Sequence, residues 1–158
     1  MSNFLKQQEE ELAVFESFIQ VCGYPIVKES IQRQNPPSPD IFCQLATGLT
    51  IEFELTNSIE PELAQKMNDN KFLDKGGFSN DEPIERTVWN KNSKLKEDKY
   101  TLRADRFELL VYLGLSPSWP YWYKRMPKFL EKNKNFWCFD RIWILRDDQF
   151  RPEILWTA

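Results

Sequence analysis

Residues 39–56 have the sequence PDIFCQLATGLTIEFELT, and this stretch decides the fold class. Residues 40–45 form a short, mainly apolar run after a proline, which predicts a strand. Thr47-Gly48 is a break of the kind that joins two strands in a hairpin. Residues 49–56 then alternate strictly between apolar side chains and Thr or Glu, which predicts a second strand with one apolar face. The stretch therefore predicts a β-hairpin.

Three carboxylates gather in this hairpin. Glu52 and Glu54 share the polar face of the second strand, and the hairpin returns Asp40 towards that face. Like charges two residues apart on one face repel each other, so a solvated strand more often alternates the sign of its charges. Mg²⁺ and Mn²⁺ prefer hard carboxylate oxygens with room for water and a phosphate. We therefore predict a metal site here, and the alternative is a half-exposed strand that happens to carry two glutamates.

The flanking sequence predicts an α/β domain. Apolar residues at helical spacing predict a helix over 3–22, which Gly23 ends, and weaker support gives a first strand within 24–34. The remaining expected elements are a helix over 83–99, a strand over 107–113, a helix within 118–133 that starts or breaks near Pro127, a strand over 139–145 and an edge strand over 154–156. Residues 68–82 are expected to be a mobile loop. Residues 1–158 are thus predicted to form one domain, with a mixed central sheet flanked by helices.

Glu11 interrupts the apolar stripe of the first helix. At about 100° per residue it falls between Phe15 and Phe18 in angle. A carboxylate on an apolar face has to be paired, bound to a metal or placed at the wet end of the stripe.

The order helix, strand, Pro-Asp strand, Glu-rich strand, helix and strand, over residues 3–113, resembles the PD-(D/E)xK nuclease superfamily. The resemblance implies a restriction-endonuclease-like αβββαβ core and Mg²⁺- or Mn²⁺-dependent hydrolysis of DNA phosphodiesters. It implies Asp40, Glu52 and Glu54 as catalytic metal ligands. It also makes Glu11 the glutamate that members carry on the first helix.

One element of the motif departs from the family pattern. It aligns either as Glu52-Phe53-Glu54, with Glu54 in the place of the lysine, or as Glu54-Leu55-Thr56, with Thr56 there. Neither alignment supplies the lysine. The candidates to supply it from elsewhere are Lys28, Lys94, Lys96 and Lys99.

Charge is unevenly distributed along the chain. Residues 1–82 carry six Lys or Arg and fourteen Asp or Glu, whereas residues 83–158 carry fifteen and ten. A basic half beside a carboxylate site suits a protein that holds a phosphate backbone. Lys94 and Lys96 are expected to polarise the scissile phosphate. The expected nucleic-acid contacts are Lys96, Lys99, Arg103, Lys124, Arg125 and Lys128. The alternative is that these side chains only lie on solvent-exposed helix faces.

Aromatic residues are abundant in the basic half of the chain. Residues 119–123 (WPYWY) could stack unpaired bases, form a subunit interface or complete the core, whereas Trp137 and Trp143 are expected in the core.

The composition excludes several classes of function. The 158 residues contain no histidine, which removes His-based triads, HNH-type nucleases and His-ligated zinc. Three widely spaced cysteines fit small buried side chains in a reducing compartment. Because neither a signal peptide nor an apolar membrane span is evident, the expected location is the cytoplasm, with no membrane partner.

The sequence therefore predicts a Mg²⁺-dependent nuclease-like protein with DNA as its partner, acting as a homodimer or within a larger defence-type complex. The alternative is a catalytically inactive relative that binds nucleic acid or protein, for example as an adaptor or immunity factor.

Overall fold

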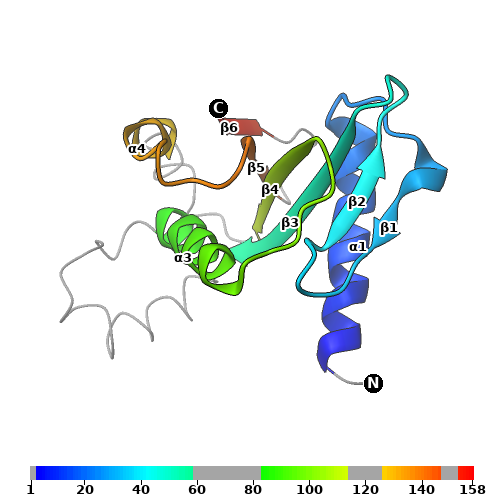
Figure 1. Ribbon diagram of the computed structural model, residues 1–158, viewed down its shortest axis with the longest axis horizontal. Helices are drawn as coiled ribbons and strands as arrows, with labels where there is room; N and C mark the ends of the chain where they lie inside the picture. The colour runs from blue at the N-terminus through cyan, green and yellow to red at the C-terminus, as the bar shows by residue number, and fades with distance from the viewer. Residues whose placement is uncertain (1–2, 59–82, 114–125, 147–152) are drawn as a thin grey trace.

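The computed structural model describes residues 3–58, 83–113, 126–146 and 153–158 (Figure 1). The elements in chain order are α1 (Asn3–Val21), the 3₁₀ helix η1 (Lys28–Ser30), β1 (Gln32–Arg33), β2 (Ile41–Gln44), β3 (Thr50–Ser58), α3 (Pro83–Asp98), β4 (Arg106–Leu113), α4 (Met126–Lys132), β5 (Arg141–Arg146) and β6 (Glu153–Thr157). The expected loop over 68–82 and the aromatic run over 119–123 lie outside the described residues.

Six strands form one mixed sheet in the order β1-β2-β3-β4-β5-β6. The pairs β1–β2, β2–β3 and β5–β6 are antiparallel, whereas β3–β4 and β4–β5 are parallel. The predicted α/β class and mixed sheet are confirmed. The predicted hairpin is present as β2 and β3, and Gly48 turns it with a φ of 93°, a left-handed conformation that favours glycine.

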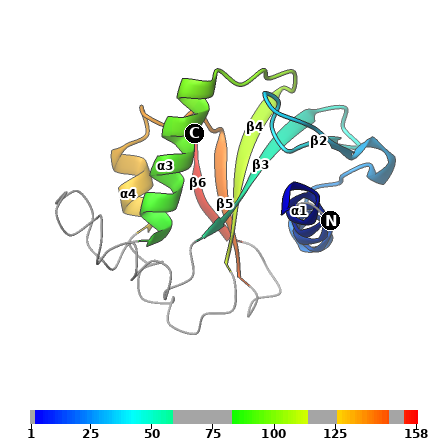
Figure 2. The same ribbon diagram turned by 90° about the horizontal axis from the view of Figure 1, so that it is seen from below.

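The sheet separates two hydrophobic cores (Figure 2). α1 packs on one face, where Phe15 and Phe18 meet Ile51, Phe53 and Leu55 of β3. Each of these five side chains is at most 1% exposed, and burying one stabilises the fold by roughly 1.5–3 kcal/mol. The other face is covered by α3 and α4, and its core includes the predicted Trp137, whereas the predicted Trp143 lies in the α1 core.

The predicted first strand within 24–34 is present only as β1, where Gln32 and Arg33 pair with β2. Ile26 forms an isolated bridge with Leu45, and residues 28–30 form η1. The Ser30 hydroxyl donates to the Val27 carbonyl and accepts the Gln44 backbone N–H at 2.8 Å. A serine side chain thus takes the place of a backbone partner and interrupts the ladder.

Glu108 of β4 is a buried carboxylate in the α1-facing layer. It is 0% exposed and accepts Trp143 Nε1 at 2.6 Å, Arg106 Nε at 3.0 Å and the Tyr24 hydroxyl at 3.0 Å. Arg141 Nη1 in turn donates to the Tyr24 hydroxyl at 2.7 Å. This charge is fully paired, so it is part of the scaffold.

Cys22, Cys43 and Cys138 are free thiols, and burial raises the pKa of each. A search of the described helices finds none with the length and apolar character of a membrane span.

Candidate functional site

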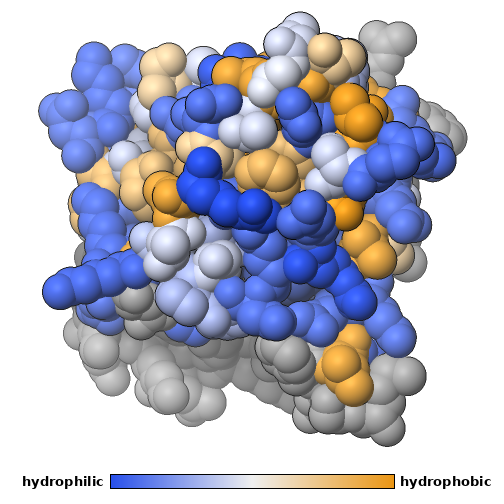
Figure 3. All heavy atoms as spheres, turned by 45° about the vertical axis from the view of Figure 1, so that its right-hand side comes forward, coloured by the Kyte–Doolittle hydropathy of each residue, from blue (hydrophilic) through white to orange (hydrophobic). Residues whose placement is uncertain are grey.

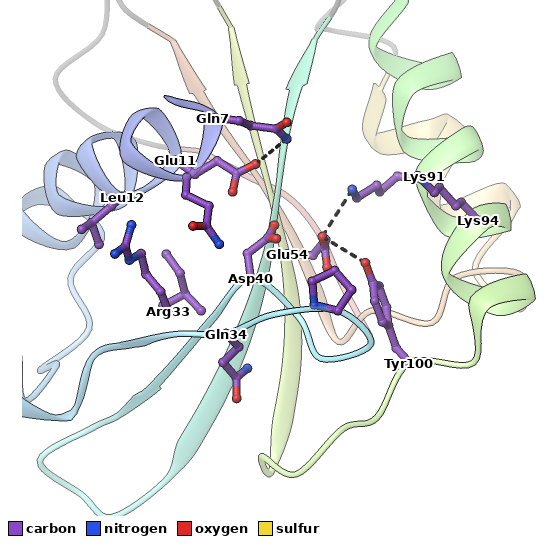
Figure 4. Close-up of a pocket in the computed structure, with 13 residues that line it drawn as sticks. Gln7, Glu11, Leu12, Arg33, Gln34, Asp40, Glu54, Lys91, Lys94 and Tyr100 are labelled. Carbon is purple, nitrogen blue, oxygen red and sulfur yellow. Dashed lines mark hydrogen bonds and ion pairs between the residues drawn. The ribbon is translucent and has the colours of Figure 1, made fainter. Parts of the chain in front are cut away.

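Asp40 and Glu54 stand opposite each other at the start of β2. Ile41 pairs with Phe53 in the β2–β3 ladder, so Asp40, one residue earlier, faces Glu54. Asp40 Oδ2 accepts the Leu55 backbone N–H at 2.8 Å, which fixes its carboxylate against β3. The hairpin register therefore brings together two of the predicted carboxylates (Figure 4).

Glu54 is buried but incompletely satisfied. It is 1% exposed, and its Oε1 lies 3.3 Å from Lys91 Nζ and 3.5 Å from the Tyr100 hydroxyl (Figure 4). Its Oε2 is buried and accepts no hydrogen bond from the described residues, and when Glu54 is protonated the carboxyl can hydrogen-bond to the Asp40 side chain. Burial, followed by the negative charge of Asp40, raises the pKa of Glu54 to about 9, although Lys91 opposes the shift. At neutral pH this carboxyl is therefore protonated unless a further cation enters.

Glu11 reaches the same pocket from α1, on the opposite side of Asp40 from Lys91 (Figure 4). It is 9% exposed and accepts Gln7 Nε2 at 3.0 Å. Burial and the charge of Asp40 raise the pKa of Glu11 to about 6. Its place in the apolar stripe is explained by this polar pocket at the edge of the α1 core.

The pocket has a volume of about 160 Å³. Its lining residues are Gln7, Gln8, Glu11, Leu12, Arg33, Gln34, Pro36, Asp40, Ile41, Glu54, Lys91, Lys94 and Tyr100. Across the described part of the chain, no group of three or more His, Cys, Asp or Glu side chains is arranged to hold a metal ion. Asp40 and Glu54 remain a pair, which is as many carboxylates as Mg²⁺ commonly takes when water and a phosphate complete its shell.

Glu52 lies on the same face of β3 but is engaged elsewhere. It is 0% exposed, and its Oε1 accepts the backbone N–H groups of Arg103 and Ala104 at 2.7 and 2.9 Å. Its Oε2 accepts Gln34 Nε2 at 2.9 Å. Glu52 thus holds the loop after α3 and is not among the residues that line the pocket with Asp40. Glu52 and Glu54 are both buried, so this face of the strand is not half-exposed as the alternative assumed.

Lys91 is the cation that sequence reasoning overlooked at this site. It lies three residues after Val88 and four before Leu95, two residues that are buried against the sheet. This spacing places it on the inward face of α3, and its side chain is 22% exposed. A lysine within an otherwise apolar stripe was the available signal. Tyr100 and Gln34 carried no comparable signal.

The predicted basic residues are distributed over several surfaces. Lys94 lines the pocket, whereas Lys96 lies over the Phe136 ring, 4.3 Å from its centroid. Lys99 is exposed at the end of α3, where its φ is 49°. Lys128 is exposed on α4.

Four further basic candidates lie outside this pocket or outside the described residues. Arg103 is exposed beside β1 and β2. Lys28, in η1, lines a different hollow with Leu12 and Glu16. Lys124 and Arg125 lie outside the described residues.

No family model, no curated protein and no solved structure matches the chain. A functional assignment therefore rests on the geometry of the pocket.

Proposed function

We propose that the protein is a divalent-cation-dependent phosphodiesterase of the PD-(D/E)xK type that acts on DNA. The observation that carries the proposal is the buried Glu54 carboxyl opposite Asp40, whose Oε2 accepts no hydrogen bond from the described residues. Burial and the neighbouring charge of Asp40 raise the pKa of Glu54, which indicates that the two carboxylates lack positive charge, and a divalent cation would supply it. The element order α1-β1-β2-β3-α3-β4 supports a restriction-endonuclease-like core.

The donor set fits Mg²⁺ or Mn²⁺. Asp40 and Glu54 would be direct ligands through hard oxygens, and Glu11 would act through a bound water. When bound, such a cation lowers the pKa of its water and polarises a phosphoryl oxygen. Glu52 is left out of this set because its oxygens already accept three hydrogen bonds.

Lys91 takes the role of the motif lysine in this proposal. Its ammonium group lies beside Glu54, where it would stabilise negative charge that develops on the phosphate. Of the two alignments, this favours Glu54-Leu55-Thr56. Thr56 and Lys91 line one pocket of about 450 Å³, so a side chain from either position reaches the same space. Lys94, at the rim, would contact the phosphate.

Cleavage assays with Mg²⁺ or Mn²⁺ test the proposal on plasmid and single-stranded DNA. Wild type should cleave, and Asp40→Asn, which keeps an acceptor for the Leu55 N–H, should lose both cleavage and calorimetric Mg²⁺ binding. Lys132→Gln, on the exposed end of α4, is the matched control and should behave as wild type. Wild type that neither binds Mg²⁺ nor cleaves DNA would end the proposal.

A second candidate is a catalytically inactive relative that binds nucleic acid or a partner protein. It is favoured because Thr56 stands where the family motif has a lysine. Here Mg²⁺ would have no effect. Salt-sensitive binding of nucleic acid, if present, would survive Asp40→Asn.

A further inference from the structure

Arg103 is an exposed arginine that is held in one geometry. Its guanidinium lies over the Phe42 ring, 3.8 Å from the ring centroid. Its Nε donates to Gln34 Oε1 at 3.0 Å, and its Nη2 donates to Gln32 Oε1 at 2.9 Å. An exposed arginine normally keeps much rotamer freedom, so three contacts to one side chain indicate a preorganised group.

The charge of Arg103 is not neutralised by its surroundings. Both side-chain partners are neutral amides, and within the described ranges no carboxylate lies within 4.0 Å of its guanidinium nitrogens. The glutamines occupy one edge of the guanidinium and Phe42 covers one face. Its Nη1 edge makes no hydrogen bond to the described residues. A fixed arginine with an open donor edge is suited to an anion.

Glu52 connects this arginine to the carboxylate pair. It holds the backbone at Arg103 through Oε1 and the Gln34 side chain through Oε2. Gln34 also donates its backbone N–H to the Asp40 carbonyl at 2.8 Å. Glu52 is two residues from Glu54 on one strand, which is roughly 7 Å. Arg103 is therefore held in register with the Asp40–Glu54 pair but does not line its pocket.

We propose that Arg103 is a fixed binding point for a backbone phosphate of the substrate, distinct from the phosphate at the Asp40–Glu54 pair. The inference rests on the proposed function, because it takes the pair as the place of cleavage. The face that carries β1 and β2 has a band of strongly hydrophilic side chains (Figure 3). Arg103 acts as a positioning residue and sets where along the strand the pair meets the backbone.

Binding without cleavage tests this inference on the full chain. Fluorescence anisotropy with a labelled single-stranded oligonucleotide in EDTA gives Kd over a range of salt concentrations. Arg103→Gln should raise Kd about tenfold near 0.1 M salt. It should also lower the slope of log K against log salt by about one. Arg103→Lys should restore the slope, and Lys132→Gln should change neither value.

Several outcomes would overturn the inference. It fails if wild type does not bind the oligonucleotide, or if Arg103→Gln leaves Kd and slope unchanged. A further contrary outcome combines two results: Arg103→Gln weakens binding without changing the salt slope, and wild type binds an abasic oligonucleotide more weakly than the normal one. Stacking of Arg103 on a base would then explain its contribution to binding. Because EDTA removes the cation, an Arg103 effect on binding without any cleavage in Mg²⁺ would overturn the nuclease alone. Circular dichroism confirms that each variant is folded.

Discussion

The ammonium group of Lys91 lies 3.3 Å from Glu54 Oε1, although the two residues come from different elements, α3 and β3. The contact leaves the site short of positive charge. Lys91 lowers the pKa of Glu54, but burial and Asp40 raise it further, to about 9. The contact between Lys91 and Glu54 is thus poorly explained as a stabilising salt bridge. We propose instead that both residues belong to a site that a further cation would complete.

Moving the lysine tests its role. Lys91→Gln should lower kcat on DNA by about 100-fold with a smaller change in KM, because the lost charge acts on the developing phosphate charge. Adding Thr56→Lys to Lys91→Gln should recover at least about tenfold of that loss, since both positions line one pocket. The measurement is steady-state cleavage in Mg²⁺. An unchanged kcat in Lys91→Gln would remove Lys91 from the mechanism.

Glu54 should make stability depend on pH when no divalent cation is present. Its folded pKa of about 9 exceeds the ordinary value of 4.5. The folded state therefore holds a proton that the unfolded state releases, and stability falls as pH rises from about 4.5 to 9. The slope is at most about 1.4 kcal/mol per pH unit. Urea unfolding between pH 6 and 8.5 measures it, and Glu54→Gln should flatten the dependence. An equal slope in both proteins would show that another group is responsible.

Cation binding should release protons. A bound cation requires Glu54 to be ionised, so Mg²⁺ affinity should rise by up to about tenfold per pH unit between pH 7 and 8.5. Calorimetry in two buffers of different ionisation enthalpy should give close to one proton released near pH 7.5. Because Glu11, with a pKa of about 6, is already ionised there, it should add little. No release, together with a flat affinity, would mean that the cation does not contact Glu54.

Glu52→Gln separates a metal ligand from a structural group. Because Glu52 accepts three hydrogen bonds, the amide would place a donor against either Gln34 or the 103–104 backbone. We expect a loss of stability of about 1–3 kcal/mol and weaker DNA binding, with Mg²⁺ affinity changed by less than about threefold. Urea unfolding and Mg²⁺ calorimetry on the same preparation give both values. A loss of Mg²⁺ binding as large as that of Asp40→Asn would make Glu52 a ligand.

Glu108→Ala should be strongly destabilising without any role in the site. The change leaves Arg106, Trp143 and Tyr24 without their buried acceptor, at a cost of about 3–5 kcal/mol. Urea unfolding measures the loss. Glu153→Ala, at an exposed position of β6, should change stability by less than about 0.5 kcal/mol. A loss below about 1 kcal/mol in Glu108→Ala would contradict the network.

The pattern of residues 49–56 predicted which side chains of β3 face the α1 core, because alternation follows directly from strand geometry. It placed Glu52 and Glu54 together on the other face, and that is where they lie. The pattern could not separate their surroundings. Glu54 meets α3 and Glu52 meets the loop at 103–104, and these contacts depend on how segments distant in sequence pack on the sheet.

The first strand is shorter than predicted for a related reason. Strand propensity describes residues 24–34 one at a time, whereas the Ser30 hydroxyl takes over a hydrogen bond that a ladder would use. The sequence prediction missed Lys91 because the density of basic residues along the chain does not show which of them faces the sheet. The position of Lys91 relative to Val88 and Leu95 was the informative measure.

Among the described residues, the sheet divides the interior into two cores that share no side chain, and the pocket takes Glu11 from the α1 layer and Lys91 from the α3 layer. Local opening of either layer would therefore dismantle the pocket while the opposite core stays packed. An occupant held by both helices would suppress both openings at once, so it would act as a cross-link between otherwise independent cooperative units. The affinity for such an occupant would then also depend on the fraction of molecules in which the α1 and α3 layers are both packed on the sheet.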